Sequence, residues 1–136
     1  MSNQIENEVF IKFSIQKSKK KNLDITNYLD IEPSKTWIKG DSKIHKGITK
    51  YKSNGWEIEL KKDNVLHIDE VLEELINLLL PKKDKLINLK DGVKKISIIV
   101  YSNKIMPSFV YNHKIISFLN DTNIQLEQDI YCIGRV

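Results

Sequence analysis

The 136-residue chain has little cysteine and few glycines, and each shortage argues against a class of site. Cys132 is the only cysteine, which excludes an internal disulfide and favours a reducing compartment. No Cys-x-x-Cys or His-x-x-x-His pair is present, and His45, His67 and His113 lie far apart, so we expect no metal site. The five glycines form neither a dinucleotide-binding loop nor a P-loop, and we therefore expect no cofactor.

Long hydrophobic runs and nucleophile motifs are missing as well. The longest apolar run is centred on residues 78–80 and is far too short to span a membrane, so we expect no membrane partner. Residues 1–10 contain no basic segment followed by an apolar one, and we expect a cytoplasmic protein without a signal peptide. There is no Gly-x-Ser-x-Gly motif, and Cys132 is predicted to lie on the apolar face of a strand, where thiols are usually inert. We therefore name no catalytic residue.

Arginine is almost absent, although the chain is basic. Its 22 lysine and arginine residues exceed its 18 acidic residues and give a net charge of +4, yet Arg135 is the only arginine. Arginine makes the forked contacts by which proteins recognise phosphate and guanine. The excess of lysine, together with abundant isoleucine and asparagine, is typical of an AT-rich genome. We favour coding bias over an anionic partner as the source of the charge.

Hydrophobic periodicity predicts alternating strands and helices. Residues 8–16 alternate apolar and polar side chains, as in a half-buried strand. Residues 68–79 carry one continuous apolar stripe at helical spacing, and Pro81 ends that helix. The remaining expected strands are 56–60, 94–102 and 124–133, with 94–102 central because it is apolar on both faces; the remaining expected helices are 24–30, capped by Asp24, 82–90 and 111–121.

This order is β-α-β, a helix, and β-α-β again, which predicts a single α+β domain over residues 1–136 with a frayed terminus at 1–7. We expect two similar halves joined by a helix. They would share one mainly antiparallel or mixed four-stranded sheet with helices packed on one face, a ferredoxin-like sandwich. Residues 34–53 are expected to be irregular.

The irregular stretch contains the best candidate for a binding surface. Six lysines in it face a single acid, Asp41, among aromatic residues that include Trp37 and Tyr51. Lysines can neutralise phosphates while an aromatic ring offers a stacking face, but a tryptophan beside a turn is more often a core anchor. Carboxylates here can also brace backbone amides. The candidate surface comprises Glu32, Trp37, Lys39, Asp41, Lys43, His45, Lys46 and Trp56.

Four short segments in a fixed order carry a resemblance to a known family. They are Ile-Glu-Pro-Ser at 31–34, Trp-Ile-Lys-Gly-Asp at 37–41, Asn-Gly-Trp at 54–56 and Asp-Ile-Tyr at 129–131. Together they resemble the bacterial family described as domain of unknown function 4279, over about residues 9–133. The resemblance implies a small, single-domain bacterial protein, and it implies no activity and no catalytic residue.

Three functional hypotheses follow. The first, which we favour, is a non-enzymatic protein-interaction module, immunity- or adaptor-like, that binds another protein through residues 35–52 and a sheet edge. The second is an RNA- or DNA-binding domain that uses the lysine-rich loop with Trp37 and Tyr51. The third is an enzyme with a carboxylate cleft near Trp37, Glu57 and Asp129, because Glu57 and Glu59, like Glu127 and Asp129, share one face of a strand.

Overall fold

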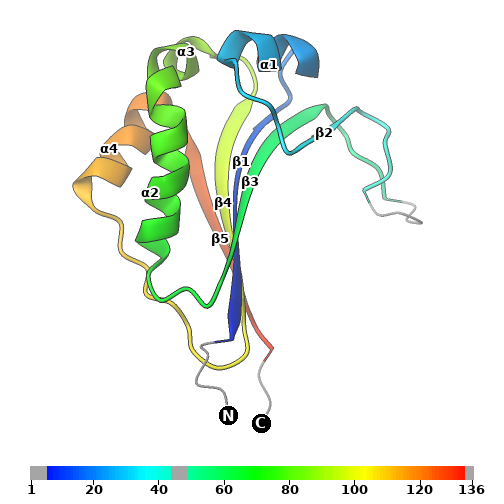
Figure 1. The fold of residues 1–136 in the computed structure, drawn as a ribbon. Helices are drawn as coiled ribbons and strands as arrows, with labels where there is room; N and C mark the ends of the chain where they lie inside the picture. The colour runs from blue at the N-terminus through cyan, green and yellow to red at the C-terminus, as the bar shows by residue number, and fades with distance from the viewer. Residues whose placement is uncertain (1–5, 44–48, 134–136) are drawn as a thin grey trace.

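A computed structural model of the chain describes residues 6–43 and 49–133. They form one five-stranded sheet in the order β2-β3-β1-β4-β5, with helices packed on one face (Figure 1). Among these residues no helix is long and apolar enough to cross a membrane. In chain order the elements are β1 (Asn7–Gln16), α1 (Asn22–Leu29), β2 (Lys35–Trp37), β3 (Gly55–Asp63), α2 (Ile68–Leu79), the 3-10 turn η1 (Leu80–Lys82), α3 (Lys83–Asn88), β4 (Val93–Ser102), α4 (His113–Thr122) and β5 (Gln125–Cys132).

The α+β class is confirmed, but the prediction of four strands is wrong. A fifth strand, β2, forms within the stretch expected to be irregular and pairs antiparallel with β3. The central strand is β1, which is antiparallel to both β3 and β4, while β4 and β5 are parallel neighbours. A ferredoxin-like sandwich is built from split β-α-β units, in which another strand lies between the two parallel strands. Here β4 and β5 are parallel and directly adjacent, so the ferredoxin-like sandwich is not confirmed. The two halves of this chain therefore differ in topology.

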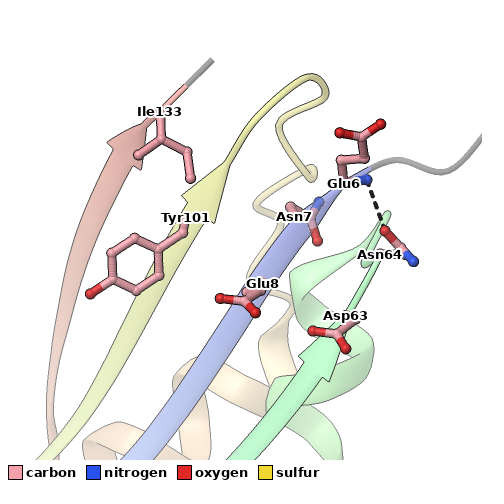
Figure 2. Close-up of a pocket in the computed structure, with 7 residues that line it drawn as sticks. All are labelled: Glu6, Asn7, Glu8, Asp63, Asn64, Tyr101 and Ile133. Carbon is pink, nitrogen blue, oxygen red and sulfur yellow. Dashed lines mark hydrogen bonds between the residues drawn. The ribbon is translucent and has the colours of Figure 1, made fainter. Parts of the chain in front are cut away.

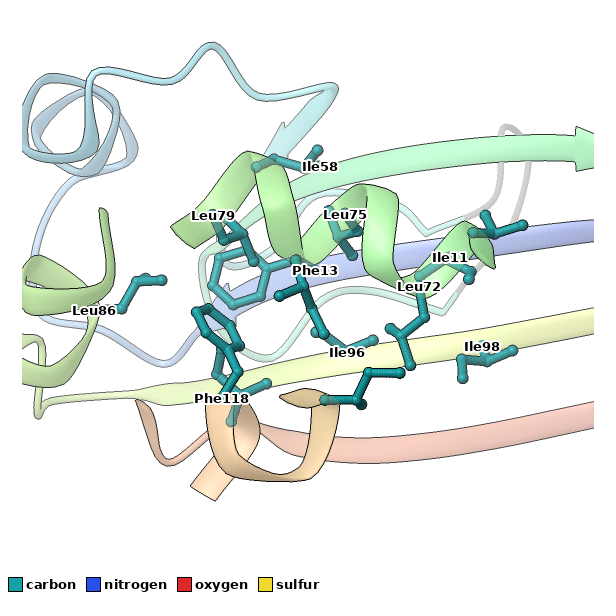
Figure 3. Packing of buried hydrophobic residues seen from close by; sticks show 14 of the residues in the cluster. Ile11, Phe13, Ile58, Leu72, Leu75, Leu79, Leu86, Ile96, Ile98 and Phe118 are labelled. Atoms are coloured by element: carbon teal, nitrogen blue, oxygen red, sulfur yellow. The ribbon is translucent and has the colours of Figure 1, made fainter. Parts of the chain in front are cut away.

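The core lies between the sheet and α2, as the helical stripe predicts. Six side chains of α2 are buried: Ile68, Val71, Leu72, Leu75, Ile76 and Leu79. They pack on the alternating apolar positions of the central strands, including the fully buried Phe13 and Ile96, and α4 adds Phe118 from the side (Figure 3). Burying such a side chain contributes about 1.5–3 kcal/mol, so α2 holds the sheet mainly through this stripe.

The start of α1 differs from the prediction, whereas its end agrees with it. Asp24 is not the N-cap; that position is Lys21, and Asp24 lies in the first turn, where its charge still favours the positive end of the helix dipole. The helix ends at Leu29 because Asp30 adopts a left-handed conformation (φ 55°) just ahead of Pro33.

The two ends of the described chain also differ from the prediction. Asn7 is not frayed: it begins β1, is 3% exposed, and its side chain hydrogen bonds with both backbone groups of Val65. At the other end, Cys132 is exposed and not inert core. The cause is the position of β5 at the edge of the sheet, where most of its side chains stay exposed.

Candidate binding surface

Residues 38–43 and 49–52 continue from β2 and pair with each other as two antiparallel arms, which we call the hairpin (Figure 1). Ser42 and Lys50 form an antiparallel bridge, and Tyr51 exchanges backbone hydrogen bonds of 2.9 Å with Gly40 and Asp41. The carboxylate of Asp41 also accepts a 2.9 Å hydrogen bond from the backbone N–H of Ile38. Asp41 therefore braces the turn, which makes it a structural residue of the hairpin.

Trp37 is the centre of the packing at the base of this hairpin. Its ring stacks on Tyr51 with centroids 4.6 Å apart and lies directly over Gly55, its partner on β3. Only 7% of the residue is exposed. Lys35 lies 5.6 Å from the Trp37 ring and donates a 3.1 Å hydrogen bond to the Tyr51 hydroxyl, which raises the lysine pKa. Trp37 therefore anchors the hairpin and leaves little ring surface for a ligand.

Trp56 lies on the opposite face of the sheet from Trp37. It is fully buried, meets Phe13 edge to face at 6.3 Å, and donates from Nε1 to Thr26 Oγ1 at 2.9 Å. This donation satisfies the only polar group of the indole within the core. The expectation that Trp56 belongs to a binding surface does not agree with its complete burial. Trp56 instead joins α1 to the sheet.

The other predicted surface residues are scattered. Lys39 and Lys43 are exposed on the hairpin, and Lys43 lies 5.6 Å from the Tyr51 ring. Glu32 is exposed beside α1 and borders a shallow cavity of about 250 Å³ with Pro33 and Thr36. His45 and Lys46 lie outside the described residues. The structure thus brings Trp37, Asp41 and Lys43 together and separates Glu32 and Trp56 from them.

The second face of the sheet, which we call the uncovered face, has no helix over it within residues 6–43 and 49–133 (Figure 1). Strand register places Glu59, Lys12, Ser97 and Glu127 in one row across four strands. Two ion pairs lie in or beside this row, Lys12 with Glu59 at 3.7 Å and Lys95 with Glu127 at 3.4 Å. Exposed pairs of this kind contribute little stability, so the row mainly defines the charge pattern of the face.

An aromatic cluster on the uncovered face was missed by the sequence reading. Tyr101 of β4 stacks on Tyr131 of β5 at 5.1 Å, and Phe10 of β1 meets Tyr101 edge to face at 6.0 Å. Tyr101 is 36% exposed and Tyr131 is 48% exposed. The sequence did contain one indication of it, because three strands with alternating patterns each carry an aromatic residue at a position where a polar one is expected. The cluster itself depends on strand order, which the sequence does not give.

The carboxylates of the hypothetical enzyme cleft are not brought together. Glu57 and Glu59 do share the uncovered face, as do Glu127 and Asp129. Two strands lie between β3 and β5, however, so Glu57 and Asp129 are separated by at least about 14 Å. Burial raises the pKa of Glu57, and the nearby charges of Lys12 and Lys35 offset part of that rise.

The raised pKa of Glu57 predicts a specific dependence of stability on pH. Because the folded pKa lies above the unfolded one, the stabilising contribution of protonated Glu57 is lost as the pH rises through the folded value. We expect Glu57→Gln to be at least as stable as the parent at neutral pH, with the advantage disappearing below about pH 4. Denaturant unfolding across this range measures it, with Glu59→Gln as the control on the same face. A parent that is more stable than Glu57→Gln at neutral pH would contradict the raised pKa.

A shallow pocket of about 370 Å³ lies at the end of the uncovered face beside the aromatic cluster (Figure 2). Its lining is Glu6, Asn7, Glu8, Asp63, Asn64, Tyr101 and Ile133. Two of its acids, Glu8 and Asp63, share Lys61 at 3.5 and 3.3 Å, and these contacts raise the pKa of that lysine, mainly through Asp63. In the part of the chain that the structure describes, no group of three or more His, Cys, Asp or Glu residues is arranged to hold a metal ion.

Comparison with known proteins identifies a matching family. Residues 7–133 match the family model of the domain of unknown function DUF4279. No curated protein matches, and no solved structure matches. The match covers nearly the whole chain, including all five strands and both tryptophans, and agrees with the resemblance of the four short segments. The chain therefore belongs to the DUF4279 family.

Proposed function

We propose that the chain is a non-enzymatic protein-interaction module, immunity- or adaptor-like, that binds another protein through the hairpin region 35–52 and an edge of its sheet. The observation that carries this proposal is the aromatic cluster of Phe10, Tyr101 and Tyr131 on the uncovered face. Tyrosine is enriched at protein interfaces because its ring is apolar and its hydroxyl tolerates water. A sheet face that only met solvent would not require such a cluster.

The exposed apolar residues around the cluster support the same reading. Ile130 and Ile133 are 43% and 59% exposed and lie on or directly after the same edge strand as Tyr131. Apolar side chains that gather at one edge, next to charged rows, are typical of an interaction site. The separated carboxylates, in contrast, give an enzyme no shared cleft among the described residues.

The test is capture of partners from the host lysate with tagged protein, in nuclease-treated and untreated halves. We expect a stoichiometric protein that survives nuclease and is lost with Tyr131→Ser. The control is Ile116→Ser, which removes an equally exposed apolar side chain from α4. Capture that is unchanged by Tyr131→Ser, or the absence of any captured protein, would overturn the proposal.

The second candidate is nucleic-acid binding by the hairpin, because Lys35, Lys39, Lys43, Lys50 and Lys52 are all exposed there. It predicts affinity for RNA or DNA that falls steeply with salt, and a shallower slope for Lys39→Ala or Lys43→Ala. The packing of Trp37 between Tyr51 and Gly55 weakens this candidate, because the ring has little free surface for a base.

A further inference from the structure

The free edge of β5 is unusually open. This strand of eight residues pairs only with β4 among the described residues, in unbroken parallel register from Gln125 to Cys132. Natural sheets protect such edges with charged side chains, above all lysine, and with proline, bulges or very short strands. The sequence QLEQDIYC contains no lysine and no proline, and the register has no bulge, so the charge of two acids, Glu127 and Asp129, is its one protection of these kinds. The opposite edge strand, β2, is only three residues long.

The direction of the backbone groups shows which amides the edge offers. The N–H of Ile133 donates a 2.8 Å hydrogen bond to the carbonyl oxygen of Ser102 at the end of β4. Backbone groups alternate in direction along a strand, so odd-numbered residues here bond to β4 and even-numbered residues point outward. Gln128, Ile130 and Cys132 therefore present their N–H and carbonyl groups to any added strand.

The side chains of β5 define what such a strand should carry. Glu127, Asp129 and Tyr131 lie on the uncovered face, and Gln128, Ile130 and Cys132 lie on the helix side. Every charge on the strand is negative, and the pocket with Glu6, Glu8 and Asp63 continues the acidic character along the same end of the sheet (Figure 2). Three lysines pair with four of these five acids: Lys104 with Glu6, Lys61 with Glu8 and Asp63, and Lys95 with Glu127. The acids still exceed these lysines by two, with Asp129 outside the pairs, although the whole chain carries a net charge of +4.

We infer that the β5 edge accepts an extended segment of another protein, with alternating basic and apolar side chains, as a sixth strand of the sheet. Main-chain hydrogen bonds to Ile130 and Cys132 supply affinity, and side chains supply specificity. Basic residues of the segment lie beside Glu127 and Asp129, and apolar residues cover the helix side of Ile130. This inference rests on the proposed function and names the edge and the chemistry of the partner.

A second copy of this chain is a poorer occupant of the same edge. Two β5 strands paired about a two-fold axis would gather Glu127 and Asp129 of both copies, without a basic residue from either strand. Like charges across a strand pair are destabilising. Charge complementarity therefore favours a basic partner over self-association.

The first experiment uses two synthetic peptides as long as β5, with blocked ends, one alternating lysine and valine and the other alternating glutamate and valine. Amide hydrogen exchange and amide chemical shifts of the full chain report binding. We expect the lysine peptide to slow exchange at Ile130 and Cys132 and to bind roughly tenfold tighter than the glutamate peptide. General attraction to the +4 chain would give the reverse order. Equal binding, tighter glutamate binding, or shifts confined to residues 35–52 would overturn the inference.

Variants separate the edge from general charge. Asp129→Lys should weaken binding of the lysine peptide by roughly tenfold. Glu70→Lys makes the same charge change on α2 and should leave this binding unchanged. Ile130→Pro removes an outward N–H that β4 does not use, and should abolish binding while thermal unfolding shows the chain folded. Unchanged binding by Asp129→Lys, or a dimer formed through β5 in solution, would also overturn it.

The same variants distinguish this inference from the proposed function. A lysate partner that is lost with Tyr131→Ser but retained by both Ile130→Pro and Asp129→Lys would leave the interaction module standing and overturn the strand addition. If Ile130→Pro loses both the lysate partner and binding of the lysine peptide, the result supports the interaction module and the strand addition.

Discussion

Replacing Trp56 with alanine should lower the free energy of unfolding by about 3–5 kcal/mol, the usual cost of removing a large aromatic side chain from a core. Trp56 is fully buried, and the truncation leaves a cavity beside Phe13. It also leaves the hydroxyl of Thr26 without its indole partner at 2.9 Å. The loss should fall mainly on the attachment of α1, because Thr26 belongs to that helix.

Denaturant unfolding monitored by circular dichroism measures this loss. Trp56→Phe keeps most of the ring volume but no donor for Thr26, so it should be clearly less damaging than the alanine variant. Tyr131→Ala, at an exposed aromatic residue, should cost less than about 1 kcal/mol. A Trp56→Ala protein as stable as the parent would show that Trp56 is not core, and would return it to the candidate binding surface.

Local periodicity was enough to predict most elements of the fold. The stripe from Ile68 to Leu79 predicted α2 with the bounds that the structure gives it, because a long repeat on one face is hard to satisfy in any other way. The alternation from 8 to 16 predicted β1 and its buried side in the same manner. The prediction that residues 94–102 form a central strand agrees only in part: β4 lies inside the sheet, between β1 and β5, but the central strand is β1.

Pairing between distant segments could not be predicted in the same way. Strand β2 has only three residues, too few for a periodic signal, and it exists because it pairs with β3. The sequence of β5 alternates like a buried strand, yet its position at the sheet edge exposes Ile130 and Cys132. The alternation of apolar side chains indicates which residues share one face of a strand. The position of the strand in the sheet decides whether those side chains are covered, and the sequence does not give that position.

The features of the candidate site that depend on nearby residues could be predicted, whereas those that depend on strand order could not. The bracing role of Asp41 depends on residues within three positions of it, and the prediction agrees with the observed hydrogen bond to Ile38. Trp37 and Trp56 both flank turn signals, but they lie on opposite faces because one is opposite Gly55 and the other is its neighbour. The aromatic cluster joins residues 10, 101 and 131, and only strand order brings them together.

Gly55→Ala should destabilise the protein by about 1–3 kcal/mol and displace Trp37 from Tyr51. A Cβ atom at position 55 would lie 1.9 Å from Cε2 and Cζ2 of the Trp37 ring, which no real contact allows. The rigid indole must swing away from β3, and it then loses the burial that leaves only 7% of it exposed. The reduced backbone freedom of alanine in the unfolded chain offsets only part of this loss.

Gly40→Ala is the matched control, because it adds the same methyl group at a glycine of the hairpin that continues from β2. In the part of the chain that the structure describes, no atom beyond the two adjacent residues lies within 4 Å of a Cβ there, but the positive φ of 97° makes alanine strained. The control should therefore lower stability without moving the Trp37 ring.

Two-dimensional NMR separates the two variants through the indole N–H signals. Gly55→Ala should shift the Trp37 signal strongly and the Trp56 signal little, whereas Gly40→Ala should leave both signals near their parent positions. If Gly55→Ala kept the Trp37 signal and full stability, the stack on Tyr51 would not depend on the glycine, and Trp37 would have the room on its ring that ligand binding requires.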